Sequence, residues 1–177
     1  IMAGKIATQY VIGKGHKRIG GVFKLDDSQG SRRYFGFLEA MNEASLRVTG
    51  NDLLWFDTVD IENEENVRQL AERIRKRLST RTALVLYNDE SAYKIINEFN
   101  KMGLKIPDDI SIVGIDDTVL STNGTVQITS VAYPTEEIAV KAANNLLELI
   151  KNGRFDATYE FSVHIVERDS VKDLTDN

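Results

Sequence analysis

The chain has 177 residues, of which 42% are hydrophobic and 28% are charged, and its formal net charge at pH 7 is −5. This is the composition of an ordinary folded domain, and its acidic balance argues against direct DNA binding, because the overall field repels a polyanion. The absence of cysteine excludes disulfides and thiolate metal sites, and it agrees with a reducing compartment such as the cytoplasm.

Apolar residues alternate between the helical period and the strand period along the chain, which is typical of an α/β protein. In chain order the pattern predicts helix 3–13, strand 18–23, helix 31–44, strand 53–56, helix 63–78, strand 83–87, helix 89–102, strand 110–115, an extended piece 127–131, helix 134–152 and a half-exposed edge strand over 159–165. The polar tail 169–177 is expected to be frayed.

The most regular unit lies between residues 83 and 115. Strands 83–87 and 110–115 lack polar alternation, which is typical of strands buried on both faces of a parallel sheet. The helix between them makes this segment a βαβ unit with a right-handed connection. The sequence therefore predicts a parallel sheet that is sandwiched by helices.

Polar side chains follow three of the predicted strands at the point where each strand ends. In parallel sheets these carboxyl ends lie at one edge, and ligands of open α/β sheets bind beyond it. We therefore expect a ligand site at this edge, with these candidates: Lys24, Asp26, Asp27 and Gln29 after the first strand, Asn88, Asp89 and Glu90 after the third, and Asp116 and Asp117 after the fourth.

Simpler interpretations remain open for several of these residues. Asp89 and Glu90 precede a helix and suit its N-terminus as capping acids, whereas Asp116 is followed by a loop. Arg33 lies in the first turn of its predicted helix, where a cation opposes the dipole. Either a binding role for its planar fork of donors or a surface salt bridge explains that position, while Arg32 is expected to be solvated.

The common catalytic signatures are missing. The glycine-rich stretch 13–18 precedes a strand, whereas phosphate-binding glycines follow one, and His16 is expected to be structural. GxSxG, HExxH and GK[ST] do not occur, so we expect no catalytic residue, cofactor or metal. A magnesium-dependent phosphatase remains an alternative, although Lys24 is not where that chemistry needs a lysine. The sequence shows no charged-then-apolar leader and no apolar run of about 18 residues. We therefore expect no signal peptide and no membrane partner.

Four segments together resemble the effector-binding domain of LacI/GalR-type bacterial transcription regulators. They are GKGHKRIGGVF, GFLEAM, ALVLYNDESAYKIINEFNKMGLKIPDDISIVGIDD and ITSVAYPTEEIAVKAANNLLELI, and the resemblance extends over about residues 2–168. The stretch FKLDDSQGSRR-x-x-GF is more selective. It is similar to arabinose-responsive repressors that join a GntR-type winged-helix head to a LacI-type sensor.

The resemblance implies a periplasmic-binding-protein-like (type I) fold of two lobes, of which this chain is expected to hold the second. Residues 1–131 would form the C-terminal lobe, residues 132–153 the hinge and a helix that returns to the first lobe, and residues 154–177 the terminal strand and tail. The first lobe and the DNA-binding head would lie outside this sequence. The apolar face of helix 134–152 would then need another cover.

The resemblance also implies a set of ligand-binding residues. Arg33, Asn88 and Asp116 match sugar-contacting positions of the family, and Tyr133 matches a position near the hinge. Lys24, Asp27 and Gln29 are weaker candidates, and a wall of the site is expected from Trp55, Phe56 or Asp57. Aromatic rings suit sugars because the CH-rich faces of a sugar are apolar.

The implied function is binding without chemistry. The family would bind a monosaccharide effector, here expected to be L-arabinose, and act as a homodimer that contacts operator DNA only through the absent head. A periplasmic-type sugar-binding protein of a transporter shares the fold and remains the second alternative.

Overall fold

A sheet of six strands forms the centre of the structure, a computed structural model that describes residues 1–154 and 158–175. The strand order is β2-β1-β3-β4-β5-β6, and only β6 runs antiparallel to its neighbour. The strands are β1 (Ile19–Lys24), β2 (Leu53–Phe56), β3 (Ala83–Leu86), β4 (Ser111–Asp116), β5 (Thr129–Ala132) and β6 (His164–Val166).

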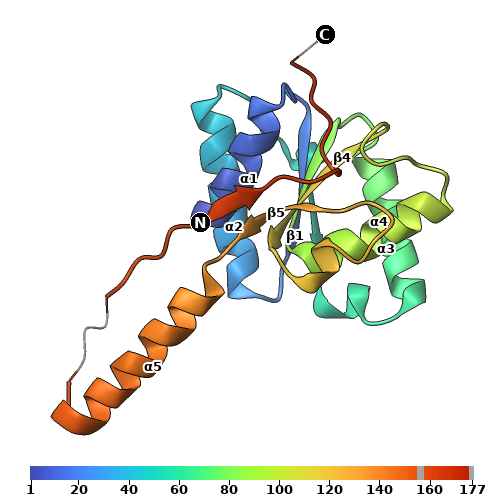
Figure 1. Cartoon of the computed structure of the whole chain (residues 1–177). Coiled ribbons are helices and arrows are strands. Elements are labelled where there is room, and N and C mark those ends of the chain that lie inside the picture. The colour runs from blue at the N-terminus through green and yellow to red at the C-terminus, as the bar shows by residue number, and fades with distance from the viewer. Residues whose placement is uncertain (155–157, 176–177) are drawn as a thin grey trace.

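Helices cover both faces of the sheet, as predicted. Figure 1 shows α1 and α2 on one face and α3 and α4 on the other, while α5 leaves the body. The helices are α1 (Met2–Gly13), α2 (Ser28–Glu43), α3 (Glu64–Arg77), α4 (Asp89–Lys101) and α5 (Thr135–Asn152), with short 3-10 turns η1 (Gly50–Asp52), η2 (Thr58–Ile61) and η3 (Val119–Ser121). The expected parallel sheet between helices is therefore confirmed.

Two apolar cores lie on the two faces of the sheet. All four residues of β3 are buried, and alternate side chains enter opposite cores, which explains why the strand has no polar alternation. One core joins the sheet to α1 and α2 through rings such as Phe23 and Phe37, and the other joins it to α3 and α4 through Ile74 and Phe99. Each fully buried large side chain contributes about 1.5 to 3 kcal/mol relative to exposure.

The helices α1 and α2 pack with their backbones in direct contact. A Cβ atom on Gly4 would lie 2.1 Å from the Arg33 carbonyl oxygen, and one on Gly36 would lie 2.1 Å from the carbonyl oxygen of Ile1. Only glycine permits this close crossing, so α1 fixes the position of the helix that carries Arg33.

Two predicted boundaries were wrong. The helix expected at 31–44 begins at Ser28, because the Asp27 carboxylate accepts a hydrogen bond from the Gln29 backbone N–H and caps it. The edge strand expected over 159–165 contains only His164–Val166. Tyr159 and Phe161 lie in irregular chain before it, and residues 155–157 lie outside the described part of the structure.

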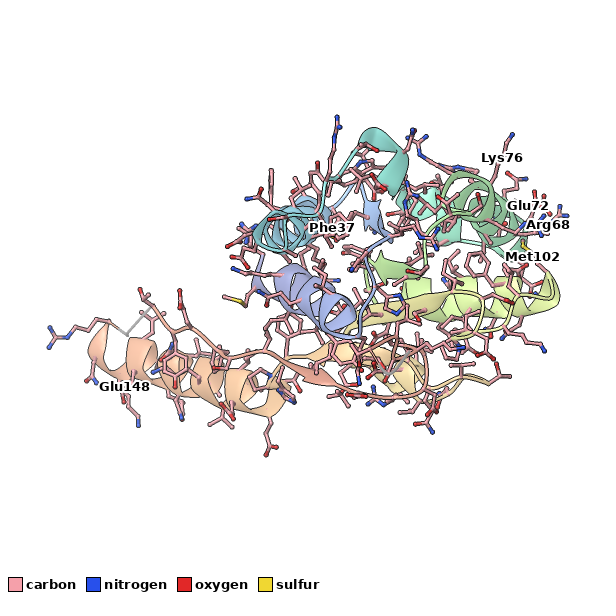
Figure 2. All side chains as sticks on the ribbon, turned by 90° about the horizontal axis from the view of Figure 1, so that it is seen from above. Phe37, Arg68, Glu72, Lys76, Met102 and Glu148 are labelled. Atoms are coloured by element: carbon pink, nitrogen blue, oxygen red, sulfur yellow. The ribbon has the colours of Figure 1, made fainter. Side chains whose placement is uncertain are left out.

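The helix α5 extends away from the body as an arm. Figure 2 shows Glu148 on this arm at the opposite end of the molecule from Arg68 and Glu72 of α3. No residue of α5 is buried, and of its predicted apolar face Ile138 is half-buried while Ala142, Leu146 and Leu149 are exposed. The described residues therefore supply no cover for this face. None of the described helices combines the length and hydropathy that crossing a membrane requires.

The tail is ordered through Thr175, which corrects the expectation that residues 169–177 are frayed; residues 176–177 lie outside the described range. Ser170 is fully buried, and its hydroxyl donates to the Ile112 carbonyl (2.5 Å) and accepts from the Thr129 backbone N–H (2.9 Å). His16, which was expected to be structural, is buried and contacts the carbonyl oxygen of Lys172 (3.0 Å). The tail therefore ties β4, β5 and the end of α1 together.

We predict that Ser170→Ala lowers the free energy of unfolding by about 1 to 3 kcal/mol, because it leaves a buried N–H and a buried carbonyl without their partner. Urea unfolding followed by circular dichroism measures this loss. The control is Ser162→Ala, whose hydroxyl group lies on an exposed residue of the same segment. Equal stabilities for the two variants would contradict the role of Ser170.

Candidate functional site

The carboxyl ends of β1, β3 and β4 meet at one edge of the sheet. These strands are adjacent and parallel, so the residues that follow them lie side by side. Arg33 reaches this edge from α2, Tyr87 follows β3, and Asp116 ends β4. Polar groups therefore gather at this edge, as the sequence predicts.

Arg33 is the centre of the cluster. Its side chain is only 5% exposed, and its Nη2 donates to Asp116 Oδ1 (2.5 Å) and to Gln29 Oε1 (3.0 Å). Its Nη1 donates to the Tyr87 carbonyl oxygen (2.5 Å), and the guanidinium carbon lies 4.7 Å from the centre of the Tyr87 ring. Arg33 is buried in the second turn of α2 and Asp116 is half-buried, so the alternative of a surface salt bridge in the first turn was wrong.

The start of α2 lies directly on the end of β1. A Cβ atom on Gly30 would lie 1.8 Å from the Lys24 carbonyl oxygen, so no other residue fits at this contact. Asp27 caps the same helix end. The sequence between β1 and α2 thus fixes where the helix begins, and with it the direction from which Arg33 enters the site.

Asp116 has an unusual backbone. Its φ is 106°, and that of Asp117 is 47°, both in the region that normally requires glycine. Such conformations cost on the order of 1 to 3 kcal/mol each and are retained mainly at functional sites. Burial raises the pKa of the Asp116 carboxyl group, and the Arg33 guanidinium opposes that change. The side chain is 29% exposed, so the carboxylate still reaches solvent.

Asp27 and Lys24 join the cluster through Tyr87. The Tyr87 hydroxyl donates to Asp27 Oδ2 (2.7 Å), and this bond is the main cause that lowers the pKa of Asp27. Burial, followed by the same bond, raises the pKa of Tyr87. The Lys24 ammonium lies 6.0 Å from the centre of the Tyr87 ring and 3.9 Å from Asp26. The structure therefore brings Lys24, Asp27 and Gln29 to Arg33.

Other predicted site residues have structural positions. The Asn88 side chain accepts from the Ser91 backbone N–H (2.9 Å) and caps α4. Tyr133 is half-buried and packs against the core on the α1 and α2 face. Phe56 is only 1% exposed and belongs to the opposite core, so the expectation that it lines the site was wrong.

The rest of the expected wall lies at the edge strand β2. Trp55 is half-buried, and its ring lies 5.1 Å from that of Tyr34 and 5.9 Å from that of Phe23, measured between centroids. Asp57 is half-buried and precedes η2. These contacts engage the Trp55 ring within the core on the α1 and α2 face.

The remaining acids are each engaged. Asp89 is fully buried and accepts from the Thr118 backbone N–H (2.7 Å) and the Ser130 hydroxyl (2.6 Å), so it supports the loop after β4. Glu90 pairs with Lys94, and Asp117 pairs with Arg168. Within residues 1–154 and 158–175, no group of three or more His, Cys, Asp or Glu side chains is placed to hold a metal ion.

Tyr87 is the residue of the site that sequence reasoning missed. It was included only as the last apolar residue of the strand 83–87. An available signal was its position, because it is an aromatic residue with a polar tip directly before the polar Asn88.

The fold and the strand-end cluster define an open α/β lobe of the ligand-binding class. The model of the family of periplasmic binding protein-like domains matches residues 8–171. The chain therefore belongs to that family.

The similar proteins include transcriptional repressors that carry two different names. An arabinose metabolism transcriptional repressor from Geobacillus stearothermophilus is 34% identical over 175 residues, which are 97% of this chain and 48% of that protein. A PurR repressor from Actinobacillus pleuropneumoniae is also 34% identical, over 97% of this chain and 51% of that protein. The chain spans about half the length of these curated relatives.

A solved structure supports the fold. A sugar-binding transcriptional regulator of the LacI family from Escherichia coli, crystallised with phosphate, superimposes with a TM-score of 0.84 at 20% identity. The superposition covers 97% of this chain and 61% of that one.

Asp89 gives the site a measurable pH dependence. Burial raises its pKa from 3.8 to about 6, although the bonds from Ser130 and Thr118 favour the charged form. The folded state therefore holds this proton more tightly than the unfolded chain does. The stability that Asp89 contributes is complete below about pH 4 and is lost as the pH rises to about 6.

We predict that Asp89→Asn, a neutral side chain of the same shape, removes this loss. The unfolding free energy of the wild type should fall relative to that of the variant by roughly 2 to 3 kcal/mol between about pH 4 and pH 7. Urea titrations of both proteins at several pH values measure the difference. Parallel pH profiles would show that folding does not raise the pKa of Asp89.

Proposed function

We propose that this chain is the effector-binding lobe of a transcriptional repressor of the LacI type, and that it binds an uncharged monosaccharide without altering it. The observation that carries the proposal is the buried pair of Arg33 and Asp116 at the open edge of a parallel sheet. An arginine fork and a carboxylate together donate to and accept from adjacent hydroxyl groups.

The charges of the cluster favour a neutral ligand. Asp116 balances the charge of Arg33, and Lys24 lies 3.9 Å from Asp26. The cluster therefore offers an anionic ligand, such as a sugar phosphate, no unbalanced cation. A sugar hydroxyl instead gains hydrogen bonds to charged groups, each worth about 1.5 to 3 kcal/mol.

L-arabinose is the first sugar to test. The relatives from Geobacillus stearothermophilus and Halalkalibacterium halodurans are both named arabinose metabolism repressors, and the segment FKLDDSQGSRR contains four residues of the cluster. The repressors named PurR make a purine the rival ligand, and one screen that includes both classes discriminates between them.

Regulation in this proposal requires parts beyond these residues. The exposed apolar side chains of α5 supply a surface on which a first lobe would pack, and the effector would bind between the two lobes. A ligand that contacts both lobes favours one angle between them, and in a cytoplasmic homodimer that angle would set the spacing of two DNA-binding heads. A GntR-type head is proposed only because the stretch FKLDDSQGSRR-x-x-GF is similar to repressors that carry one.

We predict that Asp116→Ala in the full-length protein abolishes induction and leaves operator binding intact. Loss of one charged partner should weaken sugar binding about tenfold to a hundredfold. Calorimetry with the sugar and fluorescence anisotropy with operator DNA measure the two properties. The control is Glu90→Gln, which removes a carboxylate of α4 that pairs with Lys94 instead of Arg33.

Three outcomes would contradict the proposal. Unchanged sugar binding by Asp116→Ala would move the site elsewhere. A full-length protein that binds a sugar and no DNA would favour the transporter-type alternative. Hydrolysis of a generic phosphate ester with magnesium would favour the phosphatase alternative. A thermal-shift screen of pentoses, hexoses and purines identifies the ligand class.

A further inference from the structure

Tyr87 contacts Arg33 with two different parts of the residue. Its backbone carbonyl accepts from Nη1, and its ring lies under the guanidinium at 4.7 Å. The carbonyl fixes one edge of the guanidinium, whereas the ring fixes its plane, because a guanidinium stacks on an aromatic face. The two contacts together leave the charged group little freedom to rotate.

The hydroxyl group of Tyr87 reaches the start of α2. It donates to Asp27 Oδ2, while Asp27 Oδ1 accepts from the Gln29 backbone N–H and caps the helix. Arg33 lies one and a half turns further along the same helix. Tyr87 therefore contacts α2 at two points: the cap at its start and the guanidinium of Arg33.

The contacts form a closed ring through two strand ends, and a third strand end is attached to it. They pass from Tyr87 after β3 to Asp27 after β1, along α2 to Arg33, and back to Tyr87, with Asp116 of β4 bound to Arg33. The Tyr87 side chain is 6% exposed, so it lies beneath the cluster. It contacts the groups that would bind the effector, and it does not contact the ligand itself.

We propose that Tyr87 is the positioning residue of the effector site, which holds the Arg33 guanidinium in one fixed pairing with Asp116, so that the solvent-exposed part of the carboxylate faces the sugar hydroxyls. This proposal rests on the proposed function. Without the ring, the Tyr87 carbonyl and Gln29 still hold two edges of the guanidinium, but no aromatic face fixes its plane. The Arg33–Asp116 pair then samples several orientations, and the affinity for a ligand that fits one of them falls.

The test compares three variants of the full-length protein by calorimetry with L-arabinose, or with the sugar that the screen identifies. Tyr87→Leu removes the ring and the hydroxyl, and its affinity should fall about tenfold or more. Tyr87→Phe keeps the ring and loses the bond to Asp27, and its affinity should fall about threefold. Phe99→Leu is the matched control, because Phe99 is a buried ring of the same apolar core. It should lose stability and keep wild-type affinity.

Two spectroscopic signatures separate positioning from general packing, and both are measured on the same proteins. In Tyr87→Phe, the pKa of Asp27 should rise towards its ordinary value, because its main hydrogen bond is gone. In Tyr87→Leu, the nitrogen NMR signals of the Arg33 guanidinium should broaden as the group begins to rotate, whereas Phe99→Leu should leave them sharp. Tyr87→Phe keeps the test valid if Tyr87→Leu does not fold.

Wild-type affinity in Tyr87→Phe and Tyr87→Leu, or equal losses in Tyr87→Leu and Phe99→Leu, would overturn the role of Tyr87. Arg33→Lys distinguishes that failure from failure of the proposed function. If Arg33→Lys loses binding while the Tyr87 variants keep it, the site stands and only the positioning role falls. If Arg33→Lys also binds normally, the effector site itself lies elsewhere.

Discussion

The buried ion pair between Arg33 and Asp116 is the interaction on which the arrangement of the strand ends depends. Removal of two charges from water costs several kcal/mol per ion, and the cost is offset only when the remaining donors and acceptors are also satisfied. Here Gln29 Oε1 and the Tyr87 carbonyl accept two further hydrogen bonds from the guanidinium. Loop, strand and helix must therefore meet in one geometry for the pair to exist.

Periodicity predicted the layers of this fold because burial on both faces leaves a direct trace in the sequence. The runs 83–87 and 110–115 gave β3 and β4, and the glycine at residue 153 ends α5 in the left-handed conformation expected of a helix cap. The same logic placed Asp116 at the ligand edge, since parallel strands present their carboxyl ends together, whereas Arg33 was found from its place in a helix and from the family resemblance.

The hydrogen-bond partners of side chains left no such trace in the sequence. Asp27 reads equally well as a ligand or as a cap, and Tyr87 reads as one more apolar residue of a strand until the fold brings Asp27 to its hydroxyl. The burial of Ser170 depends on β4 and β5, which are distant in sequence, so a polar tail looked frayed. These errors share one cause, because hydrogen bonds between distant segments are set by topology rather than by local pattern.

The pairing at the end of β5 gives the arm a mechanical consequence. Ala132 is in register with Asp116 on one side and with His164 on the other, so the chain enters the arm next to this carboxylate and returns to the sheet one strand further out. These two connections act as a single pivot. A rotation of α5 would therefore reach the strand next to Asp116 first, which is the carboxylate that we propose contacts the effector.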